Sequence, residues 1–173
     1  MIYYGIGLAV IIFSLLLWDF IKPQMAKKTF YRNLILELNS KHISYQITNL
    51  KNTDLPGDFI LEINRQKYLI RLILVPKYAE IIVNAKTTWE IRYGAGNTPG
   101  KAHPIKKYLP KMNHFMNYQN DEFLKVIVFK PDVKKKVRYL NESEMDFLEP
   151  TTNVYGVRVL NESELIPFII KKD

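Results

Sequence analysis

The sequence predicts a mixed α/β domain that follows one transmembrane helix. An uncharged, apolar run opens the chain, from residue 2 to residue 18. Four or five short segments with the alternation or composition of strands follow between residues 43 and 93. A helix, a buried strand and strand–helix pieces complete the order, which is typical of an α+β sandwich around a central sheet.

Residues 1–21 are expected to form the membrane anchor. A spanning helix needs about 20 apolar residues, with a lower limit near 17, and the opening run meets that limit. Tyr3, Tyr4 and Trp18 would lie near its ends, where aromatic rings prefer the headgroup region. A cleaved signal peptide would begin with Lys or Arg and end at small residues, whereas this run does neither.

Charge predicts the orientation of the anchor. Basic residues flank only its C-terminal end, at Lys22, Lys27, Lys28 and Arg32. The positive-inside rule then places the N-terminus outside and the following domain in the cytoplasm. We expect a basic juxtamembrane linker at residues 22–29 and an α/β domain at residues 30–173. Gly5 and Ala9 form a small-xxx-small pair that could pack two anchors into a homodimer.

Composition limits the chemistry of the domain. The chain of 173 residues has no cysteine, which excludes disulfides, thiolate zinc sites and cysteine nucleophiles. Its formal net charge is +8, and beyond residue 21 there are 25 basic against 16 acidic residues, a balance of +9. Such a surface favours nucleic acid, acidic lipid or an acidic protein, although a lysine-rich surface also serves solubility alone.

Apolar spacing predicts the elements of the domain. Helices are expected at residues 27–42 and 106–117, and Pro23 is expected to end or kink the anchor helix. Strands are expected at residues 43–47, 58–64, 67–75, 80–83, 88–93 and 126–129. The last of these is a continuous apolar run, which is typical of a fully buried strand.

A short repeat marks the C-terminal part. Residues 138–145 are echoed by residues 158–165, and each copy predicts a strand followed by the start of a helix. Asn141 and Asn161 each stand three residues before a Glu, which is the spacing of a capping box. Both are also N-x-S sequons, but capping is the preferred interpretation for a cytoplasmic domain.

Several catalytic motifs are absent from the sequence. There is no GxxxxGK[ST] phosphate loop, no GxSxG elbow and no HExxH zinc motif. The glycine-rich stretch of residues 94–100 lacks dinucleotide-binding spacing and is expected to be a loop. His42, His103 and His114 show no metal-ligand spacing.

Residues 58–129 carry a family resemblance. Asp58 opens one strand, a second strand follows after a tight turn, Trp89 and His103-Pro104 come next, and a buried strand ends in Phe129. This order resembles the nuclease-related domain family, whose members have the restriction-endonuclease-like fold. Residues 154–170 resemble its closing strand and helix, so the resemblance covers most of residues 30–170.

The resemblance implies a degenerate catalytic site. The family carries a Glu-x-Lys pair on its second strand, and counting from Asp58 these positions hold Arg71 and Ile73. Two carboxylates are needed to hold the divalent metal that polarises the phosphate and activates water. Arg71 repels a cation and Ile73 cannot stabilise charge. The fold is therefore expected without the nuclease activity.

An alternative keeps the activity. Glu62 or Glu80 could supply the second carboxylate and Lys86 the base. Glu62 shares a strand face with Asp58 by period two. The chain would then be a membrane-tethered, Mg²⁺-dependent nuclease; otherwise no cofactor is expected. The plainer interpretation is that Glu62 is solvated or pairs with a nearby cation.

Two basic clusters are candidates for binding nucleic acid or anionic lipid. The first contains Lys101, Lys106, Lys107 and Lys111, and the second contains Lys130, Lys134, Lys135, Lys136 and Arg138. Tyr108 and Tyr139 lie among them, which suggests stacking of single-stranded bases. A solvated, lysine-rich turn accounts for residues 134–136 equally well.

These observations favour a membrane-anchored, non-enzymatic adaptor or scaffold subunit of a membrane-associated assembly. Its expected partners are the bilayer, proteins of that assembly and nucleic acid. The nuclease or nucleic-acid-binding protein is the alternative. A purely structural subunit, in which the charge serves lipid contact alone, is the third hypothesis.

Overall fold

The computed structural model describes residues 2–51, 53–94, 105–109, 112–141 and 144–171, and of residues 2–20 only the helical backbone. The chain divides into two compact units, residues 1–41 and residues 42–173, which are described separately.

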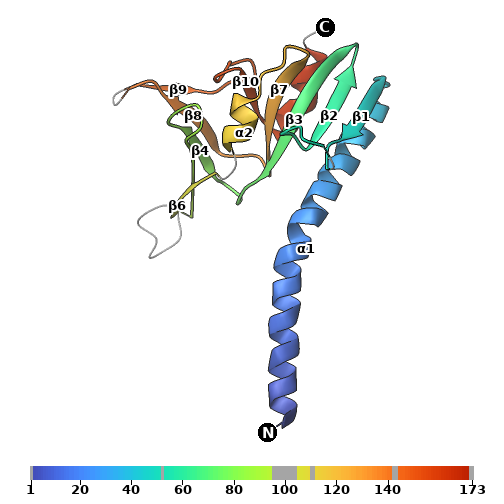
Figure 1. Ribbon diagram of the computed structural model, residues 1–173, viewed down its shortest axis with the longest axis vertical. Helices are drawn as coiled ribbons and strands as arrows, with labels where there is room; N and C mark the ends of the chain where they lie inside the picture. Colours follow the sequence, from blue (N-terminus) through green and yellow to red (C-terminus); the bar gives the residue numbers. More distant parts are fainter. Residues whose placement is uncertain (1, 52, 95–104, 110–111, 142–143, 172–173) are drawn as a thin grey trace. The chain divides into compact units, whose positions relative to one another are not determined.

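The first unit is a single helix, α1 (Ile2–Ser40). Pro23 lies inside this helix, so the prediction that the helix ends there is wrong, and the expected linker of residues 22–29 is helical (Figure 1). A proline removes one backbone hydrogen bond, and the helix-compatible residues on both sides tolerate that loss. The expected helix of residues 27–42 forms its C-terminal part, where Phe30, Leu34 and Leu38 are buried at helical spacing.

Helix α1 contains most of the expected membrane anchor. Among the fully described residues, no helix is both long and apolar enough to cross a membrane. The anchor residues Tyr3, Tyr4, Gly5, Ala9 and Trp18 lie outside that part of the chain.

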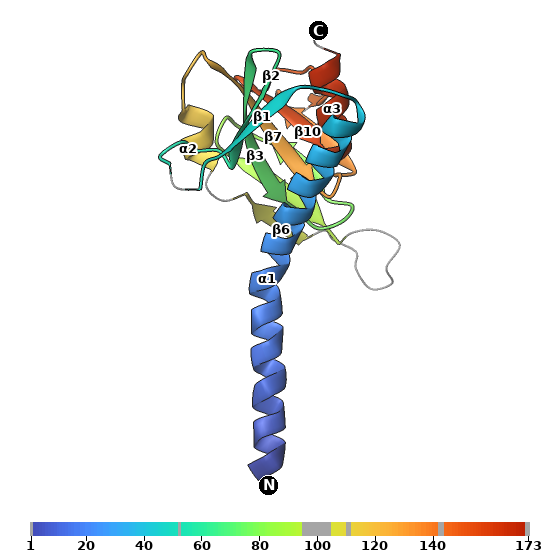
Figure 2. The same ribbon diagram turned by 90° about the vertical axis from the view of Figure 1, so that its right-hand side faces the viewer.

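Five strands of the second unit form sheet A. In spatial order they are β1 (Tyr45–Asn49), β2 (Phe59–Ile63), β3 (Gln66–Leu74), β7 (Phe123–Lys130) and β10 (Val157–Asn161). The first three are antiparallel, whereas β3, β7 and β10 are parallel. Helix α3 (Glu162–Ile170) packs on β7 and β10 (Figure 2).

Five further strands form sheet B. In spatial order they are β6 (Ile105–Tyr108), β5 (Trp89–Tyr93), β4 (Glu80–Val83), β8 (Lys135–Tyr139) and β9 (Met145–Phe147). Strands β4 and β8 are parallel, and the other pairs are antiparallel. The chain passes twice from sheet A to sheet B, from β3 to β4 and from β7 to β8. Val75 N donates to Lys130 O at 2.9 Å and Lys134 N to Ala79 O at 2.8 Å, so the two crossings run side by side.

The core lies between the two sheets. Sheet A contributes Leu69 and Phe129, sheet B contributes Ile81 and Trp89, and the short helix α2 (Met112–Asn117) contributes Phe115. All five side chains are fully buried. The architecture is therefore mixed α and β, as expected, but it contains two mixed sheets where one central sheet was expected.

The expected strands are confirmed, with shifted ends, in β1 to β5, β7 and β10. The expected helix of residues 106–117 is wrong in its first half, because residues 105–108 pair with β5 as an edge strand and helix α2 begins at Met112. Local apolar spacing carries no information on such a pairing partner.

The two copies of the repeat form different structures. After Asn161 the chain enters helix α3 through a capping box, as expected. After Asn141 no helix follows, because Glu144 N donates to Asn141 Oδ1 at 2.8 Å and Leu140 N to Glu144 O at 3.0 Å, which closes a hairpin between β8 and β9. The same Asn-to-Glu spacing thus serves a turn in one copy and a helix start in the other.

Candidate functional site

Asp58 directly precedes strand β2, and Arg71 lies on the neighbouring strand β3. The β2–β3 ladder ends at the Phe59–Ile70 pair, and Asp58 N donates to Ile70 O at 2.8 Å, so Asp58 lies beside Ile70, the residue before Arg71. The Asp58 carboxylate accepts the backbone N–H of Leu72 at 2.9 Å. Arg71 Nη1 donates to Pro56 O at 3.0 Å. The family resemblance had assigned the second carboxylate to the Arg71 position, and a half-buried cation stands there instead.

This arrangement does not suit a divalent metal. A guanidinium at the position assigned to the second carboxylate repels a cation, and Mg²⁺ requires oxygen ligands in near-octahedral geometry. Ile73, two residues after Arg71 on the same strand, packs against the core. Among the described residues, no three acidic, histidine or cysteine side chains are grouped so that they could hold a metal ion.

The residues of the nuclease alternative lie apart. Glu62 is paired with Lys67 of β3 and lies four positions after Asp58, which is about 13 Å along a strand. Glu80 belongs to sheet B. Lys86 lies in the turn between β4 and β5, where its carbonyl accepts the Trp89 indole N–H at 3.0 Å. Asp58, Glu62 and Glu80 are therefore not grouped so that they could hold a metal ion together.

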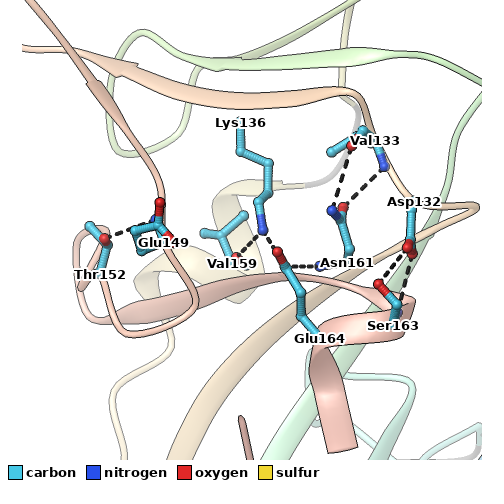
Figure 3. Close-up of polar contacts among 9 residues, drawn as sticks. All are labelled: Asp132, Val133, Lys136, Glu149, Thr152, Val159, Asn161, Ser163 and Glu164. Atoms are coloured by element: carbon cyan, nitrogen blue, oxygen red, sulfur yellow. Dashed lines mark hydrogen bonds and ion pairs between the residues drawn. The ribbon is translucent and has the colours of Figure 1, made fainter. Parts of the chain in front are cut away.

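The second basic cluster is divided between two faces of β8. Lys136 is only 7% exposed; its ammonium pairs with Glu164 and donates to Val159 O at 3.2 Å (Figure 3). Lys136 is thus an internal link between β8 and α3. Lys135 points to the opposite face of the strand, as successive strand residues do. Lys134 is exposed in the preceding turn.

Two other members of this cluster are also paired. Arg138 Nη2 lies 2.9 Å from an Asp146 carboxylate oxygen, and Lys130 Nζ lies 2.5 Å from Glu162 Oε1. The first basic cluster is described only in part, because Lys101 and Lys111 lie outside the described residues. Lys106 and its neighbour Lys107 are exposed on the edge strand β6 and point to opposite faces of sheet B.

The face of sheet B directed away from the core brings distant residues together, and we name it the outer face. Directly paired residues of neighbouring strands share a face. One row crosses the sheet through Tyr108, Glu90, Ile82, Val137 and Phe147. A second row contains Lys106, Arg92, Glu80 and Lys135, and Tyr139 and Met145 form a further pair.

The rim of the outer face is exposed and its floor is buried. Tyr108 is 70% exposed and Phe147 62%, on the two edge strands, whereas Ile82 and Val137 between them are buried. Lys135 Nζ lies 4.9 Å from the centroid of the Phe147 ring, within the range of a cation–π contact. The sheet thus presents aromatic rings and cations at its rim, around a buried floor that contains Ile82, Val137 and Glu90.

The centre of the outer face carries an ion pair. Arg92 Nε lies 2.5 Å from Glu90 Oε1. This hydrogen bond raises the pKa of Arg92, burial opposes the rise, and the Tyr139 hydroxyl adds to it. Sequence reasoning singled out Tyr108 and Tyr139 but missed Arg92 and Phe147. The period-two alternation in residues 89–93 could have indicated Arg92.

Lys125 is a buried lysine that belongs to neither basic cluster. Its ammonium donates to the backbone carbonyls of Phe115, Met116 and Tyr118 at 3.3, 3.1 and 2.8 Å, and so caps the C-terminal end of α2. Burial, and then the charge of Lys86, lower the pKa of Lys125. Lys125 and Lys86 both line a cavity of about 600 Å³.

No family model matches this chain, and neither the curated proteins nor the solved structures contain a match.

Proposed function

We propose that the chain is a single-pass, membrane-anchored, non-enzymatic adaptor with a catalytically degenerate nuclease-like domain. The N-terminus would lie outside and the domain in the cytoplasm, where it would join a membrane-associated assembly. The outer face of sheet B is the surface through which it would bind its partner.

The element order supports the nuclease-like fold. Asp58 directly precedes β2, a tight turn at Asn64 and Arg65 leads to β3, and the buried strand β7 contains Phe129 near its end. The closing strand β10 and helix α3 follow. Each of these features agrees with the pattern on which the resemblance rests.

The observation that carries the non-enzymatic assignment is Arg71 on β3, a cation at the position to which the resemblance assigns the second carboxylate. A permanently charged guanidinium stands where a second metal ligand would be needed. The Asp58 carboxylate instead binds the N–H of Leu72 and so ties β2 to β3. A structural role for Asp58 follows directly from this contact.

The full chain in detergent micelles tests this assignment. We expect no cleavage of DNA or RNA with Mg²⁺ or Mn²⁺, and no bound Mn²⁺ in paramagnetic resonance titrations. Arg71→Glu should gain Mn²⁺ affinity of at least tenfold over the parent, because it supplies a carboxylate at the position assigned to the second metal ligand. Arg71→Gln is the matched control that removes the cation without adding a ligand, and it should not show that gain.

The opposite result would establish the second candidate function. Metal-dependent cleavage by the parent chain that Asp58→Ala abolishes would show a working nuclease, and the adaptor assignment would fail. Cleavage that Asp58→Ala leaves unchanged would indicate a contaminating enzyme, and the parent would then be repurified before the adaptor assignment is judged.

The sequons provide a test of orientation. Asn141 is exposed in the β8–β9 turn and belongs to an N-x-S sequence. Translation into microsomes should leave it without a glycan if the domain stays on the cytoplasmic side. An Asn141→Gln variant is the control, and a glycan that this variant lacks would overturn the proposed orientation.

A further inference from the structure

We propose that the outer face of sheet B binds single-stranded nucleic acid, with bases stacked on Tyr108 and Phe147 and phosphates held by Lys106 and Lys135. This inference rests on the proposed function, since it names the partner of the same adaptor surface. It requires no catalytic step.

Two exposed aromatic rings of the outer face are suited to base stacking. Tyr108 and Phe147 are exposed by 70% and 62% and lie on opposite edges of the sheet. Four strand spacings separate them, which is about 19 Å. Tyr108 therefore stands apart from Phe147, which shares β9 with the exposed Met145. Separate, exposed rings on a sheet suit two non-adjacent bases of one strand, because every base has a π-face.

Lysines at the two ends of the second row are suited to phosphate contacts. Lys106 is exposed at one end of its row and Lys135 lies at the other, two residues along the strands from the rings. Between them Arg92 is engaged by Glu90, and Glu80 stands beside both Arg92 and Lys135. The two end lysines are therefore the cations of this row best placed for phosphates, and a base that stacks on the ring face covered by Lys135 would displace that ammonium from Phe147. The acidic residues at the centre disfavour a phosphate backbone there.

This distribution of charge predicts the salt dependence. Two phosphate contacts on a single strand correspond to a slope of log K against log salt of about −1.4. Stacking, which salt affects much less, should carry most of the affinity. A duplex keeps its bases stacked on one another, so it cannot use the rings and should bind more weakly.

Fluorescence anisotropy of the full chain in micelles tests the proposal. The probes are a labelled 12-nucleotide single strand of DNA, the same sequence as RNA, and the matching DNA duplex. We expect at least one single strand to bind about tenfold more tightly than the duplex. Tyr108→Ala and Phe147→Ala should each weaken binding about tenfold, as the loss of a base stack does, whereas Tyr108→Phe should retain it.

Matched control variants test whether binding depends on the outer face and not on other exposed residues. Tyr155→Ala removes a tyrosine that is 42% exposed and lies outside sheet B, and it should leave the affinity unchanged. Lys106→Ala should lower the salt slope by about 0.7, whereas Lys51→Ala, an exposed lysine between β1 and β2, should not. Circular dichroism checks that each variant is folded.

Three results would overturn the proposal: no binding at low salt, equal binding of duplex and single strand, or equal losses in Tyr108→Ala and Tyr155→Ala. Binding of anionic vesicles that Tyr108→Ala abolishes, without binding of nucleic acid, would also reject it and assign the face to lipid. These results differ from a failure of the adaptor assignment, which the metal and cleavage measurements decide.

Discussion

Lys136 of strand β8 and Glu164 of helix α3 form an ion pair that ties sheet B to the helix packed on sheet A (Figure 3). The same Glu164 carboxylate accepts the backbone N–H of Asn161 at 2.7 Å, so it also completes the capping box of α3. The Lys136 side chain is 6% exposed and that of Glu164 29%. One carboxylate therefore neutralises a buried cation and caps a helix.

Glu164→Gln should destabilise the protein by about 1–3 kcal/mol, because it leaves the Lys136 ammonium buried without its counter-charge. Lys136→Met in the same chain should restore part of that loss, since the unpaired charge is removed. Urea unfolding of the parent, the single variants and the double variant measures the coupling. A double variant whose loss equals the sum of the two single losses would contradict the internal role of the pair.

Asn161→Ala should cost about 1–2 kcal/mol, and Asn141→Ala about 0.5 kcal/mol or less. Asn161 caps helix α3, and its side chain also accepts the N–H of Val133 at 3.0 Å (Figure 3). Asn141 closes an exposed hairpin turn. Thermal unfolding of the two variants provides the comparison. Equal decreases in Tm would mean that the two asparagines stabilise the protein equally, which would contradict the prediction.

Gly57→Ala should destabilise the chain by about 1–3 kcal/mol through overpacking. A Cβ at Gly57 would lie 2.7 Å from Leu69 Cδ1 and 3.1 Å from Ile70 O. Gly156→Ala is the control: nothing lies within 4 Å of its Cβ, but φ is +85°. That variant should cost about 1 kcal/mol from backbone conformation alone. Unfolding in urea measures both, and a Gly57→Ala chain as stable as the parent would refute the steric argument.

The buried Lys125 predicts a pH effect on stability. Its pKa is lowered in the folded state from the ordinary 10.5. Between the folded and unfolded pKa values the unfolded chain binds more protons, so the stability contributed at Lys125 rises as the pH increases towards 10.5. Lys125→Met should lack this rise, and it should also cost about 1–3 kcal/mol by leaving three carbonyls without a donor.

Urea unfolding of the parent and of Lys125→Met at several pH values checks this prediction. The difference between their free energies of unfolding should increase from neutral to alkaline pH. The titration of other lysines and tyrosines occurs in both proteins and cancels in that difference. A difference independent of pH would show that Lys125 keeps its ordinary pKa in the folded protein.

Most strands could be predicted because their signals are local. Alternation in residues 43–47 and the continuous apolar run of residues 126–129 depend on neighbours along the chain, and both segments form strands. Counting from Asp58 identified Arg71 at the position expected for the second carboxylate, and only the structure shows that the Asp58 N–H is bound to Ile70 O, next to Arg71 on β3. The edge strand β6 was missed because its four residues are exposed and pair only with β5.

The sequence by itself determined the strand-forming segments, the basic charge balance, the cap at Asn161 and the absence of a Glu-x-Lys pair after Asp58. Only the tertiary structure decided that the strands form two sheets, that Lys136 is buried while Lys106 is exposed, and that Tyr108 and Phe147 share a face. These properties depend on pairing between strands that lie far apart in the chain. A side chain's face follows from the register of that pairing, which no local pattern contains.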